Sequence, residues 1–263
     1  MRLIISALHF NWSSLEQCLH IVRHDLGLDG VELSCHPSFR RPHCTREDLE
    51  RLPTLKQETG LTIDAHIWED LARLGPDAGS EALLEWLRWC EKTGIESLVL
   101  HGGSYPVQRE GIQRTREALC RVLGRYERAG VVLKLENHYA FGYRGSCELF
   151  SEPWEFLELF AACDSPALRV CYDTGHGHMT GNGEALLRAL WPYLSHIHLA
   201  DNHGQHDDHC PYRHGSVPWD DLLLLWRELG YDQTFCIEFP VRDDRQPFHR
   251  CVADLRRLAH PAA

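Results

Sequence analysis

The chain alternates short aliphatic runs with longer segments of helical periodicity along its whole length. Eight runs have the length and composition of buried strands, at Leu3–Leu8, Gly30–Ser34, Leu61–His66, Ser97–His101, Val131–Glu136, Leu168–Asp173, Leu194–Leu199 and Thr234–Phe239. Strands this short that are separated by helices must pair in parallel through right-handed crossovers, because a tight hairpin cannot return the chain past a helix. Eight such units predict a closed (β/α)₈ barrel.

Helical periodicity between these runs supports the barrel. Apolar residues recur at i, i+3, i+4 and i+7 at Leu83, Trp86, Leu87 and Cys90. Gly94 is expected to end this helix and Trp86 to lie in the core, and a second helix is expected between Pro218 and Gly230. The alternative, a doubly wound sheet, would need a glycine-rich turn that binds phosphate after the first strand, and residues 6–11 contain no glycine.

Length and charge limit the organisation and the partners of the chain. The 263 residues match the usual barrel size of about 250, and no linker divides them, so we expect one domain over residues 1–263. There is no 18-residue apolar run, and His9 comes too early for the apolar region of a signal peptide, so we expect a cytoplasmic protein without a membrane segment. The formal charge of −11 disfavours general binding to nucleic acid, without excluding a nuclease.

Cysteine and histidine are both frequent in this sequence. The 11 cysteines are odd in number, scattered from Cys18 to Cys251 and never spaced as Cys-x-x-Cys, so we expect buried, reduced thiols rather than a disulfide framework. The 18 histidines are spread along the chain instead of forming a terminal tag. This distribution of histidines indicates a functional site.

Six consecutive predicted strands end in a side chain that can bind a metal ion. These residues are His66, His101, Glu136, Asp173, His198 and Glu238, at intervals of 25 to 40 residues, the length of one βα unit. In such a barrel the carboxyl ends of the strands meet at one rim, where function resides. Carboxylates and imidazoles that converge there need a compensating cation or proton. We therefore expect a divalent metal, and ligation by nitrogen and oxygen without thiolate suits zinc, manganese, iron or cobalt.

A second polar set is expected one layer deeper in the barrel. Residues two positions before a rim residue also point inward, and on the third, fifth and seventh strands these are Asp64, Lys134 and His196. Lys134 is expected to pair with Asp64 beneath the metal as a buried structural pair, with a role for Lys134 as an acid as the alternative. Glu32 in the second strand is expected to join this polar interior.

Several segments of the chain resemble the xylose isomerase-like TIM barrel superfamily. They are Ala65-His66, Leu100-His101-Gly102-Gly103, Leu135-Glu136-Asn137-His138, Tyr172-Asp173-Thr174-Gly175-His176 and His196-Ile197-His198-Leu199-Ala200-Asp201. The superfamily contains sugar and sugar-phosphate isomerases and epimerases, and also zinc-dependent apurinic-site (AP) endonucleases. The resemblance covers nearly the whole chain, and its Asp-Thr-Gly-His and His-x-His-x-x-Asp elements are fairly specific to the superfamily but not to one activity.

The resemblance to the isomerases implies a metal held by Glu136, Asp173, His198 and Glu238. Glu136 and Glu238 would be the catalytic pair, which flanks the substrate and moves a proton between adjacent carbons through an enediol. Such a proton becomes removable only if the developing enolate charge is stabilised, and a carboxylate on each face lets protons leave and return with chosen stereochemistry. His176 would contact a substrate hydroxyl or a further metal.

The resemblance to the endonucleases implies a larger site with up to three zinc ions. Their nine ligands are matched by the four residues above together with His66, His101, His176, Asp207 and His209. The sequence therefore leaves one to three ions per chain open. Against an endonuclease stand the charge of −11, the absence of a large Lys/Arg cluster on the predicted rim, and the acidic Glu69 and Asp70 just after His66. His214 is near the place where the commoner pattern has Gly-Glu-Gly, so the loop after the seventh strand is expected to differ.

Substrate contacts are expected from loops and strand ends at the same rim. The candidates are His138, His176, Arg40, Trp12 and Trp68, with Phe141 and Trp219 as further aromatic residues at predicted loop starts. The aromatic residues would form an apolar wall over a sugar ring, and packing within the protein is the equal alternative for each of them. Arg40 and its neighbour Arg41 suit the phosphate of a sugar phosphate, or belong to a solvated loop.

The sequence leaves four functional classes open. The leading hypothesis is a metal-dependent isomerase or epimerase for a small polyhydroxylated carbonyl compound. The alternatives are an AP endonuclease-like phosphodiesterase with a trinuclear zinc site, a dehydratase or lyase that uses the same enolate chemistry, and a metal-binding barrel without turnover. Barrels of this superfamily often pair, so a homodimer is a further open expectation.

Overall fold

The computed structural model describes residues 1–35, 46–143 and 145–259. Within these ranges, eight parallel strands form a closed barrel in the order β1-β11-β10-β9-β6-β4-β3-β2, and β1 pairs with β2 to complete it. The strands are β1 (Arg2–Ser6), β2 (Gly30–Cys35), β3 (Thr62–Ile67), β4 (Ser97–His101), β6 (Val132–Glu136), β9 (Leu168–Asp173), β10 (Leu194–Leu199) and β11 (Thr234–Ile237). The predicted (β/α)₈ TIM barrel is confirmed.

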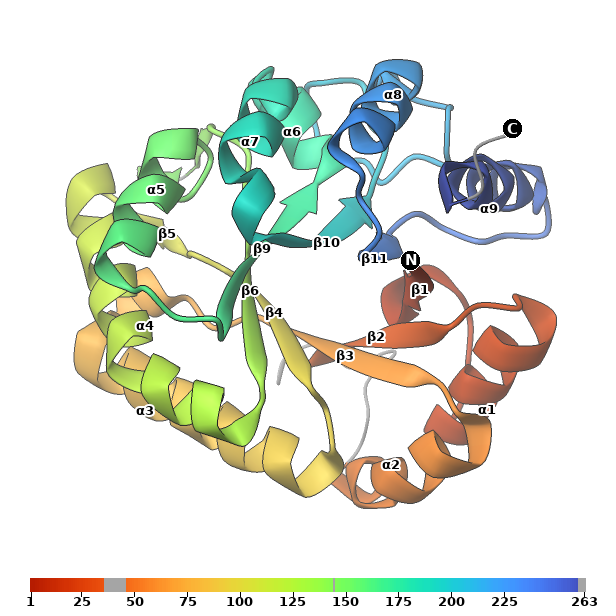
Figure 1. Ribbon diagram of the computed structural model, residues 1–263, viewed down its shortest axis with the longest axis horizontal. Helices are drawn as coiled ribbons and strands as arrows, with labels where there is room; N and C mark the ends of the chain where they lie inside the picture. Colours follow the sequence, from red (N-terminus) through yellow and green to blue (C-terminus); the bar gives the residue numbers. More distant parts are fainter. Residues whose placement is uncertain (36–45, 144, 260–263) are drawn as a thin grey trace.

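Helices surround the strands as an outer layer (Figure 1). They are α1 (Leu15–His20), α2 (Arg46–Thr59), α3 (Leu71–Thr93), α4 (Gln108–Ala129), α5 (Pro153–Ala162), α6 (Thr174–Thr180), α7 (Gly183–Leu190), α8 (Trp219–Leu229) and α9 (Gln246–Ala259), with shorter helical turns at Ala7–His9, Ile21–Asp25 and Trp191–Tyr193. Gly94 and Gly230 end α3 and α8 in the left-handed conformation, as predicted. None of the helices in the described ranges is long and apolar enough to span a membrane.

The predicted core face of α3 is confirmed. Leu83, Leu87 and Cys90 are buried. Trp86 packs against the same core while its indole nitrogen donates a hydrogen bond to Glu69 at 2.9 Å, so the side chain is only partly buried. The 3.6-residue period therefore identified the apolar side of this helix correctly.

Two strand ends differ from the prediction by two residues, and one helix start by one. The run Leu3–Leu8 leaves the sheet after Ser6, and the last strand ends at Ile237 instead of Phe239. These two strands pair with each other from Arg2 to Ile5 and from Thr234 to Ile237, and Ser6 still pairs with Glu32 of β2. The sequence pattern alone does not show where this pairing stops. Pro218 is the N-cap of α8 rather than its first residue.

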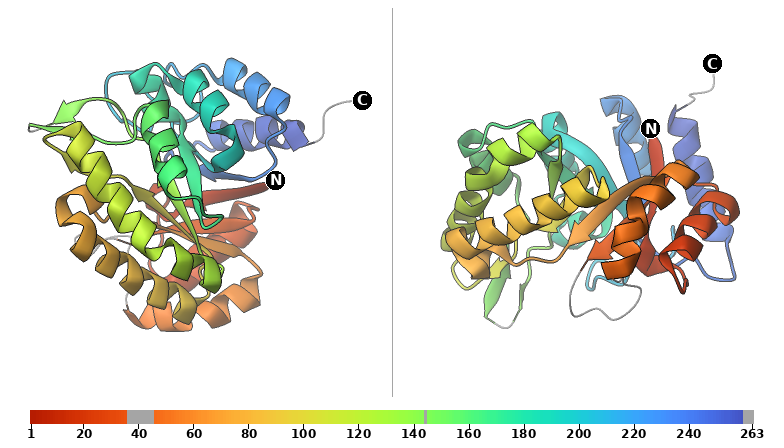
Figure 2. Two further views of the ribbon diagram at one scale, coloured as in Figure 1. Left: turned by 60° about the vertical axis from the view of Figure 1, so that its left-hand side comes forward. Right: turned by 90° about the horizontal axis from the view of Figure 1, so that it is seen from below.

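A small antiparallel sheet was not predicted. It consists of β5 (Ser104–Tyr105), β8 (Ser146–Glu148) and β7 (Gly142–Tyr143) within the described residues. Strands of two or three residues are too short to show an alternating pattern, so the sequence carries no signal for them. β5 follows β4 after two residues, and the sheet projects beyond the end of the barrel where the proposed ligands lie (Figure 2).

The expected polar layer inside the barrel is present. Lys134 Nζ donates to Asp64 Oδ2 at 2.8 Å, and both side chains are buried. His196 Nδ1 lies 3.0 Å from Lys134 Nζ. Glu32 is fully buried and lies 3.3 Å from His196 Nε2, so it belongs to this layer as predicted. The inward direction of alternate strand residues therefore placed all four groups correctly.

The prediction that all cysteines are reduced was wrong for one pair. Cys120 of α4 and Cys163, the C-cap of α5, form a disulfide whose Cα atoms are 5.4 Å apart. The pairing depends on how two outer helices pack, which Cys spacing in the sequence does not reveal. Cys90, Cys147, Cys171, Cys210, Cys236 and Cys251 are free thiols. Because disulfides are typical of oxidising compartments, the expected cytoplasmic location stays a prediction.

The buried Lys134–Asp64 pair yields a stability prediction. Lys134→Met leaves the Asp64 carboxylate buried without its cation, so we expect it to lower the free energy of unfolding by about 3–5 kcal/mol. Lys92→Met is the control, because Lys92 and Glu50 form an ion pair whose side chains are 59% and 53% exposed, and such pairs contribute about 0–1 kcal/mol. Urea unfolding followed by circular dichroism measures both. Equal losses in the two variants would contradict the assignment.

Candidate metal centre

Four proposed ligands meet at the carboxyl ends of β6, β9, β10 and β11. Glu136, Asp173, His198 and Glu238 each offer one ligand atom, these atoms lie within 4.8 Å of one another, and all four residues are buried. His198 Nδ1 lies 3.2 Å from Glu136 Oε1 and 3.3 Å from Glu238 Oε2. The structure therefore brings together residues that are up to 102 positions apart in the sequence.

A second group of ligands shares Glu136 with the first. His66 Nε2 and His101 Nε2 lie 3.4 and 3.3 Å from Glu136 Oε2. These three residues also fall within the distance range of one metal site. Because Glu136 presents Oε1 to His198 and Oε2 to His66 and His101, its carboxylate is common to both candidate ligand groups.

The remaining three proposed ligands form a third group at the edge of the centre. His176 Nε2 and His209 Nε2 each lie 3.3 Å from Asp207 Oδ2. His209 is oriented by its other nitrogen, which lies 2.7 Å from the backbone oxygen of Glu238. This group is more open than the first, since the Asp207 side chain is 29% exposed.

Several buried polar atoms at the centre have no hydrogen-bond partner among the described residues. They are Glu136 Oε2, Asp173 Oδ2, His198 Nδ1 and His66 Nε2. A buried polar atom without a partner costs free energy, so such atoms indicate a missing ligand. All four belong to the proposed ligand set and have the oxygen and nitrogen chemistry of a divalent-metal site. The residues present therefore fit a metal.

Electrostatics at the centre show the same need for positive charge. Burial alone would raise the pKa of Glu136, but the charges of His198 and His101 outweigh burial and hold the pKa well below its usual range. Asp173 lacks enough compensation, and burial raises its pKa to about 7. Burial alone would lower the pKa of His209, but its hydrogen bond to Asp207 and the charge of Glu238 outweigh burial and raise the pKa to about 10. Because of these raised pKa values, the protein without a cation binds protons at groups that a cation would contact.

The backbone around Asp173 is fixed by side chains that the sequence did not single out. The Asn137 side chain accepts a hydrogen bond from Asp173 N at 2.7 Å, and Asp173 Oδ1 accepts one from His176 N at 2.6 Å as the N-cap of α6. Position 175 requires glycine, because a Cβ there would lie only 2.8 Å from Asn202 Nδ2. The Asp-Thr-Gly-His motif therefore encodes a turn as well as a ligand.

Asp201 anchors the long loop that carries Asp207 and His209. It is fully buried and accepts hydrogen bonds from Trp219 Nε1 at 2.9 Å and from the backbone of Gly215 and Val217 at 3.0 and 3.1 Å. Its role was missed, although the His-x-His-x-x-Asp spacing contains it. The same contact favours the packing alternative for Trp219, whose indole is buried in the core.

Aromatic rings surround the ligand groups. Trp68 stacks on His66 with 5.1 Å between ring centroids, and His138 stacks on His176 at 4.6 Å. His138 Nδ1 also lies 4.0 Å from Glu148 of β8, a contact that no sequence signal predicted. Trp12 instead donates to Ala7 O at 2.9 Å and packs on the core, and the Phe141 side chain is exposed.

The predicted contacts of Arg40 and Arg41 lie outside the described residues. His214 is described, and its backbone N donates to Pro211 O at 2.9 Å in the loop between Asp207 and α8. No metal-ligand group within the described ranges includes it.

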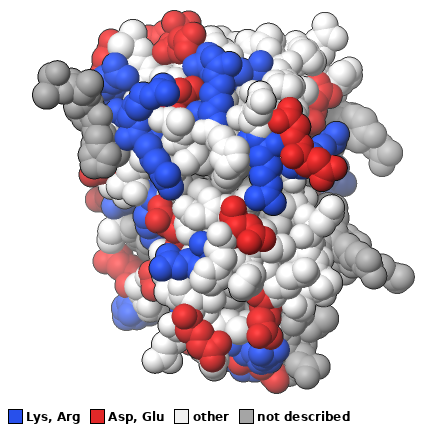
Figure 3. Space-filling model, turned by 90° about the vertical axis from the view of Figure 1, so that its right-hand side faces the viewer, with Lys and Arg blue, Asp and Glu red and all other residues white. Residues whose placement is uncertain are grey.

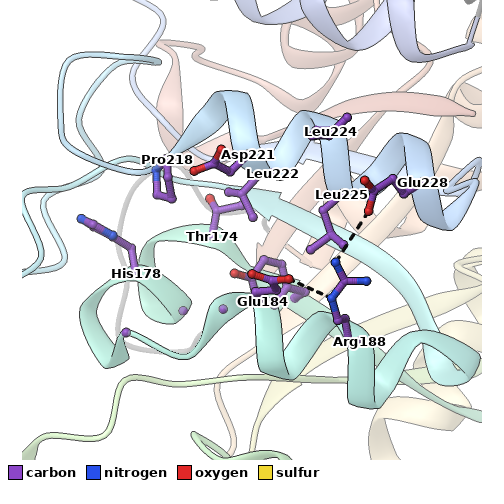
Figure 4. A pocket seen from close by; sticks show the side chains of 14 residues that line it. Thr174, His178, Glu184, Arg188, Pro218, Asp221, Leu222, Leu224, Leu225 and Glu228 are labelled. Atoms are coloured by element: carbon purple, nitrogen blue, oxygen red, sulfur yellow. Dashed lines mark hydrogen bonds and ion pairs between the residues drawn. The ribbon is translucent and has the colours of Figure 1, made fainter.

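A groove of about 410 Å³ lies away from the centre, between α7 and α8 (Figure 4). Arg188 of α7 lies across this groove, with Nε 2.8 Å from Glu184 and NH2 3.6 Å from Glu228 of α8. None of the convergent ligand groups found among the described residues includes a residue of the groove. We therefore place the chemistry at the barrel mouth, where the unpartnered ligand atoms are.

Comparison with known proteins identifies the family. Residues 22–258 match the family described as xylose isomerase-like TIM barrel. The chain belongs to this family. The match spans β2 to β11, so it contains every proposed metal ligand.

Individual relatives are distant in sequence and close in fold. An uncharacterized protein of Methanocaldococcus jannaschii is 24% identical over 255 residues, which are 90% of this chain and 83% of that protein. A solved D-tagatose 3-epimerase-like protein has a TM-score of 0.83 at 21% identity, with all of both chains covered. The D-psicose 3-epimerase of Clostridium cellulolyticum H10 has a TM-score of 0.77 at 17% identity over 99% of both chains. At these identities the solved structures establish the fold.

Cation binding is expected to stabilise the protein. Mn²⁺, Co²⁺ or Zn²⁺ should raise Tm in a thermal-shift titration, because a ligand that binds only the native state stabilises it. Glu136→Gln should lose most of this shift, since Glu136 contacts two ligand groups, while Glu155→Gln, which alters a buried carboxylate of α5, should retain it. An equal Tm shift in Glu136→Gln would contradict the site.

The same titration is expected to depend on pH in one direction. His209 has a pKa raised to about 10 and His176 a pKa well above its usual value, so both carry an extra proton at neutral pH without a cation. A cation must displace these protons, so its affinity should weaken as pH falls from 8 to 6. Isothermal titration calorimetry at several pH values measures this trend, and an affinity that strengthens as pH falls would exclude these histidines as ligands.

Proposed function

We propose that this protein is a metal-dependent isomerase or epimerase of a sugar or sugar phosphate. The observation that supports this most directly is that two carboxylates lie close to one imidazole nitrogen. Glu136 and Glu238 lie 3.2 and 3.3 Å from His198 Nδ1. They come from β6 and β11, which are separated in the barrel by β9 and β10. Two carboxylates that approach one position from different directions suit the two faces of a single substrate carbon.

The names of the structural neighbours support the same reaction class. They include a D-psicose 3-epimerase, an L-ribulose 3-epimerase and the 3-keto-D-glucoside 4-epimerase YcjR of E. coli, the last at a TM-score of 0.73 and 17% identity over 98% of this chain. Each of these names describes an epimerase. A small polyhydroxylated carbonyl compound is accordingly the substrate class that we propose.

The proposed mechanism divides proton transfer between two residues. Glu136, Asp173, His198 and Glu238 would hold the metal, which when bound supplies polarisation of the substrate's carbonyl and hydroxyl oxygens. Glu136 is ionised at neutral pH because the charges of His198 and His101 outweigh burial and hold its pKa well below the usual range. One of the two carboxylates, in its ionised form, accepts the proton from the carbon beside the carbonyl, which leaves an enediolate. The other, in its protonated form, donates a proton to the opposite face of that carbon and inverts it, so that the two glutamates exchange protonation states. In an isomerisation the first carboxylate instead returns its proton to the former carbonyl carbon, while the hydroxyl proton of the deprotonated carbon passes to the former carbonyl oxygen.

The rings around the centre supply the proposed substrate contacts. His138 and His176 offer ring nitrogens for hydroxyl groups, and Trp68 offers an apolar face beside His66. Burial, together with the charges of His176 and His101, lowers the pKa of His138 well below its usual value, so it is a neutral group that can donate or accept a hydrogen bond. Neutral, two-sided groups of this kind suit a polyol better than a highly charged ligand.

Phosphodiester hydrolysis is the second candidate, and a specific observation favours it. Glu136 joins two ligand groups, and His176, Asp207 and His209 form a third, so the centre has the ligands for more than one cation. Adjacent metal ions stabilise the attacking and leaving oxygens of a phosphate ester. Figure 3 shows the side of the barrel that carries α9, where Lys and Arg groups lie beside Asp and Glu groups.

Exchange of a carbon-bound proton tests the proposed function. Incubation of the cation-loaded protein with a panel of ketohexoses and ketopentoses in D₂O should place deuterium on the carbon beside the carbonyl, as followed by NMR. Glu136→Gln and Glu238→Gln should each slow this exchange by about 10²–10⁴-fold, the range for loss of a general acid or base. Glu91→Gln, an exposed carboxylate on α3, is the control and should exchange at the wild-type rate.

The outcomes of this experiment separate the candidate classes. Exchange accompanied by loss of water from the sugar would indicate a dehydratase or lyase. The absence of exchange across the whole panel, together with cleavage of a duplex containing an abasic site, would replace the proposal with the hydrolase.

A further inference from the structure

Glu32 lies at the centre of the polar layer beneath the metal centre. It is the third residue of β2 and is completely buried. The proposed ligand set contains no residue from β2. The proposed mechanism gives Glu32 no task, although a buried carboxylate is costly unless its neighbours compensate its charge.

Two proposed ligands, His198 and His66, lie between Glu32 and Glu136. His198 Nε2 lies 3.1 and 3.2 Å from the two oxygens of Glu32, while His198 Nδ1 faces Glu136 at 3.2 Å. His66 has the reverse orientation, since its Nδ1 lies 3.7 Å from Glu32 and its Nε2 lies 3.4 Å from Glu136. Each imidazole therefore presents one nitrogen to Glu32 and the other to the metal centre.

These orientations define which nitrogen of each ring carries a proton. An ionised carboxylate only accepts hydrogen bonds, so His198 Nε2, which is at hydrogen-bond distance from Glu32, carries the N–H. We extend the same assignment to His66 Nδ1, which faces Glu32 at 3.7 Å. In a neutral imidazole the other nitrogen then has the free electron pair that a metal needs. Glu32 would thus select Nδ1 of His198 and Nε2 of His66 as metal ligands.

Lys134 determines which nitrogen of His196, the third histidine beside Glu32, carries a proton. The ammonium group of Lys134 has no acceptor, so His196 Nδ1, 3.0 Å away, must accept from it. The proton of a neutral His196 is then on Nε2, which lies 3.3 Å from Glu32 Oε2. Asp64 holds the Lys134 ammonium at 2.8 Å. Among the described residues, ring nitrogens of His198, His196 and His66 thus lie 3.1, 3.3 and 3.7 Å from the Glu32 carboxylate, and His198 Nε2 forms a hydrogen bond to it.

We propose that Glu32 is a positioning residue of the metal centre, which sets the tautomers of His198 and His66 and is itself oriented by Lys134 through His196. The inference rests on the proposed metal site. Carboxylates that accept from the distal nitrogen of a metal-bound histidine raise its basicity and fix its ring, and their loss commonly weakens metal binding by about 10–100-fold.

A cation held by Glu32 itself is the competing explanation. Two groups that contain Glu32 offer ligand atoms within 4.8 Å of one another: Glu32, His196, His198 and Cys236, and Glu32, His66, His198 and Glu238. Two features oppose the first group. The Lys134 ammonium lies 3.0 Å from the ring of His196 and would repel a cation there, and burial raises the pKa of the Cys236 thiol well above its usual range, which disfavours the thiolate.

NMR of the unaltered protein tests the proposed tautomers directly. In long-range ¹⁵N–¹H spectra of ¹⁵N-histidine-labelled protein loaded with Zn²⁺, His198 should be protonated on Nε2 and bound to metal through Nδ1, and His66 should show the reverse. Glu32 cannot have the proposed role if either ring has the opposite assignment. This measurement does not depend on any variant folding.

Metal affinity of variants tests the consequence. The full chain, stripped of metal, is titrated with Co²⁺ and followed by its visible absorption, and Glu32→Gln should bind about 10–100-fold more weakly than wild type. A glutamine keeps the shape but presents an NH₂ group toward one of the N–H groups. Glu155→Gln, which changes another completely buried glutamate, should bind Co²⁺ as wild type does.

Any other result of the Co²⁺ titration would contradict either the positioning role of Glu32 or the metal site itself. Equal affinity in wild type and Glu32→Gln removes the positioning role and leaves the metal site intact. Loss of one whole ion per chain, with the other ions bound at wild-type affinity, replaces the positioning role by the deep cation. Failure of wild type to bind Co²⁺ or Zn²⁺ removes the metal site and the inference together.

Discussion

Buried carboxylates need positive partners, and the mouth of this barrel depends on that constraint. Parallel strands that close into a barrel bring Glu136, Asp173 and Glu238 to one rim, where burial removes the water that would otherwise solvate them. Imidazoles supply part of the compensation, and the pKa of Asp173, which burial raises to about 7, shows that it is incomplete. A divalent cation would complete it and would replace protons that the free protein holds on His176 and His209.

The layer beneath the mouth extends the same compensation into the barrel. Asp64, Lys134, His196 and Glu32 alternate in sign or hydrogen-bonding role, so each member orients the next. In the proposed arrangement this layer decides which nitrogen of His198 and His66 faces the cation. The barrel would then contribute more than a scaffold, because its packed interior would define the tautomers of the ligands above it. A family that reuses one barrel for different reactions can keep such a layer while its rim loops change.

The sequence predicted the fold, and the convergence of most candidate ligands, because both follow from the repeat of the βα unit. One candidate ligand per unit, near the end of each strand, makes the six rim positions from His66 to Glu238 recognisable without a structure. Asp207 and His209 lie on a long loop and were predicted only through family resemblance. The sequence could not decide between packing and substrate contact for Trp219, because no spacing encodes the inward contact of its indole with Asp201. The Cys120–Cys163 disulfide and the contact of Glu148 with His138 depend on packing between outer elements, so local patterns could not reveal them.

A crystal structure of the protein grown with Mn²⁺, with anomalous diffraction data, tests the central claim most directly. The account predicts an anomalous peak bounded by Glu136, Asp173, His198 and Glu238, with His198 bound through Nδ1. Further peaks beside His66 and His101, or between His176 and His209, would define the number of ions. Mn²⁺ bound only elsewhere, or a fully active protein with no peak at these four residues, would contradict the claim that the rim groups share a cation.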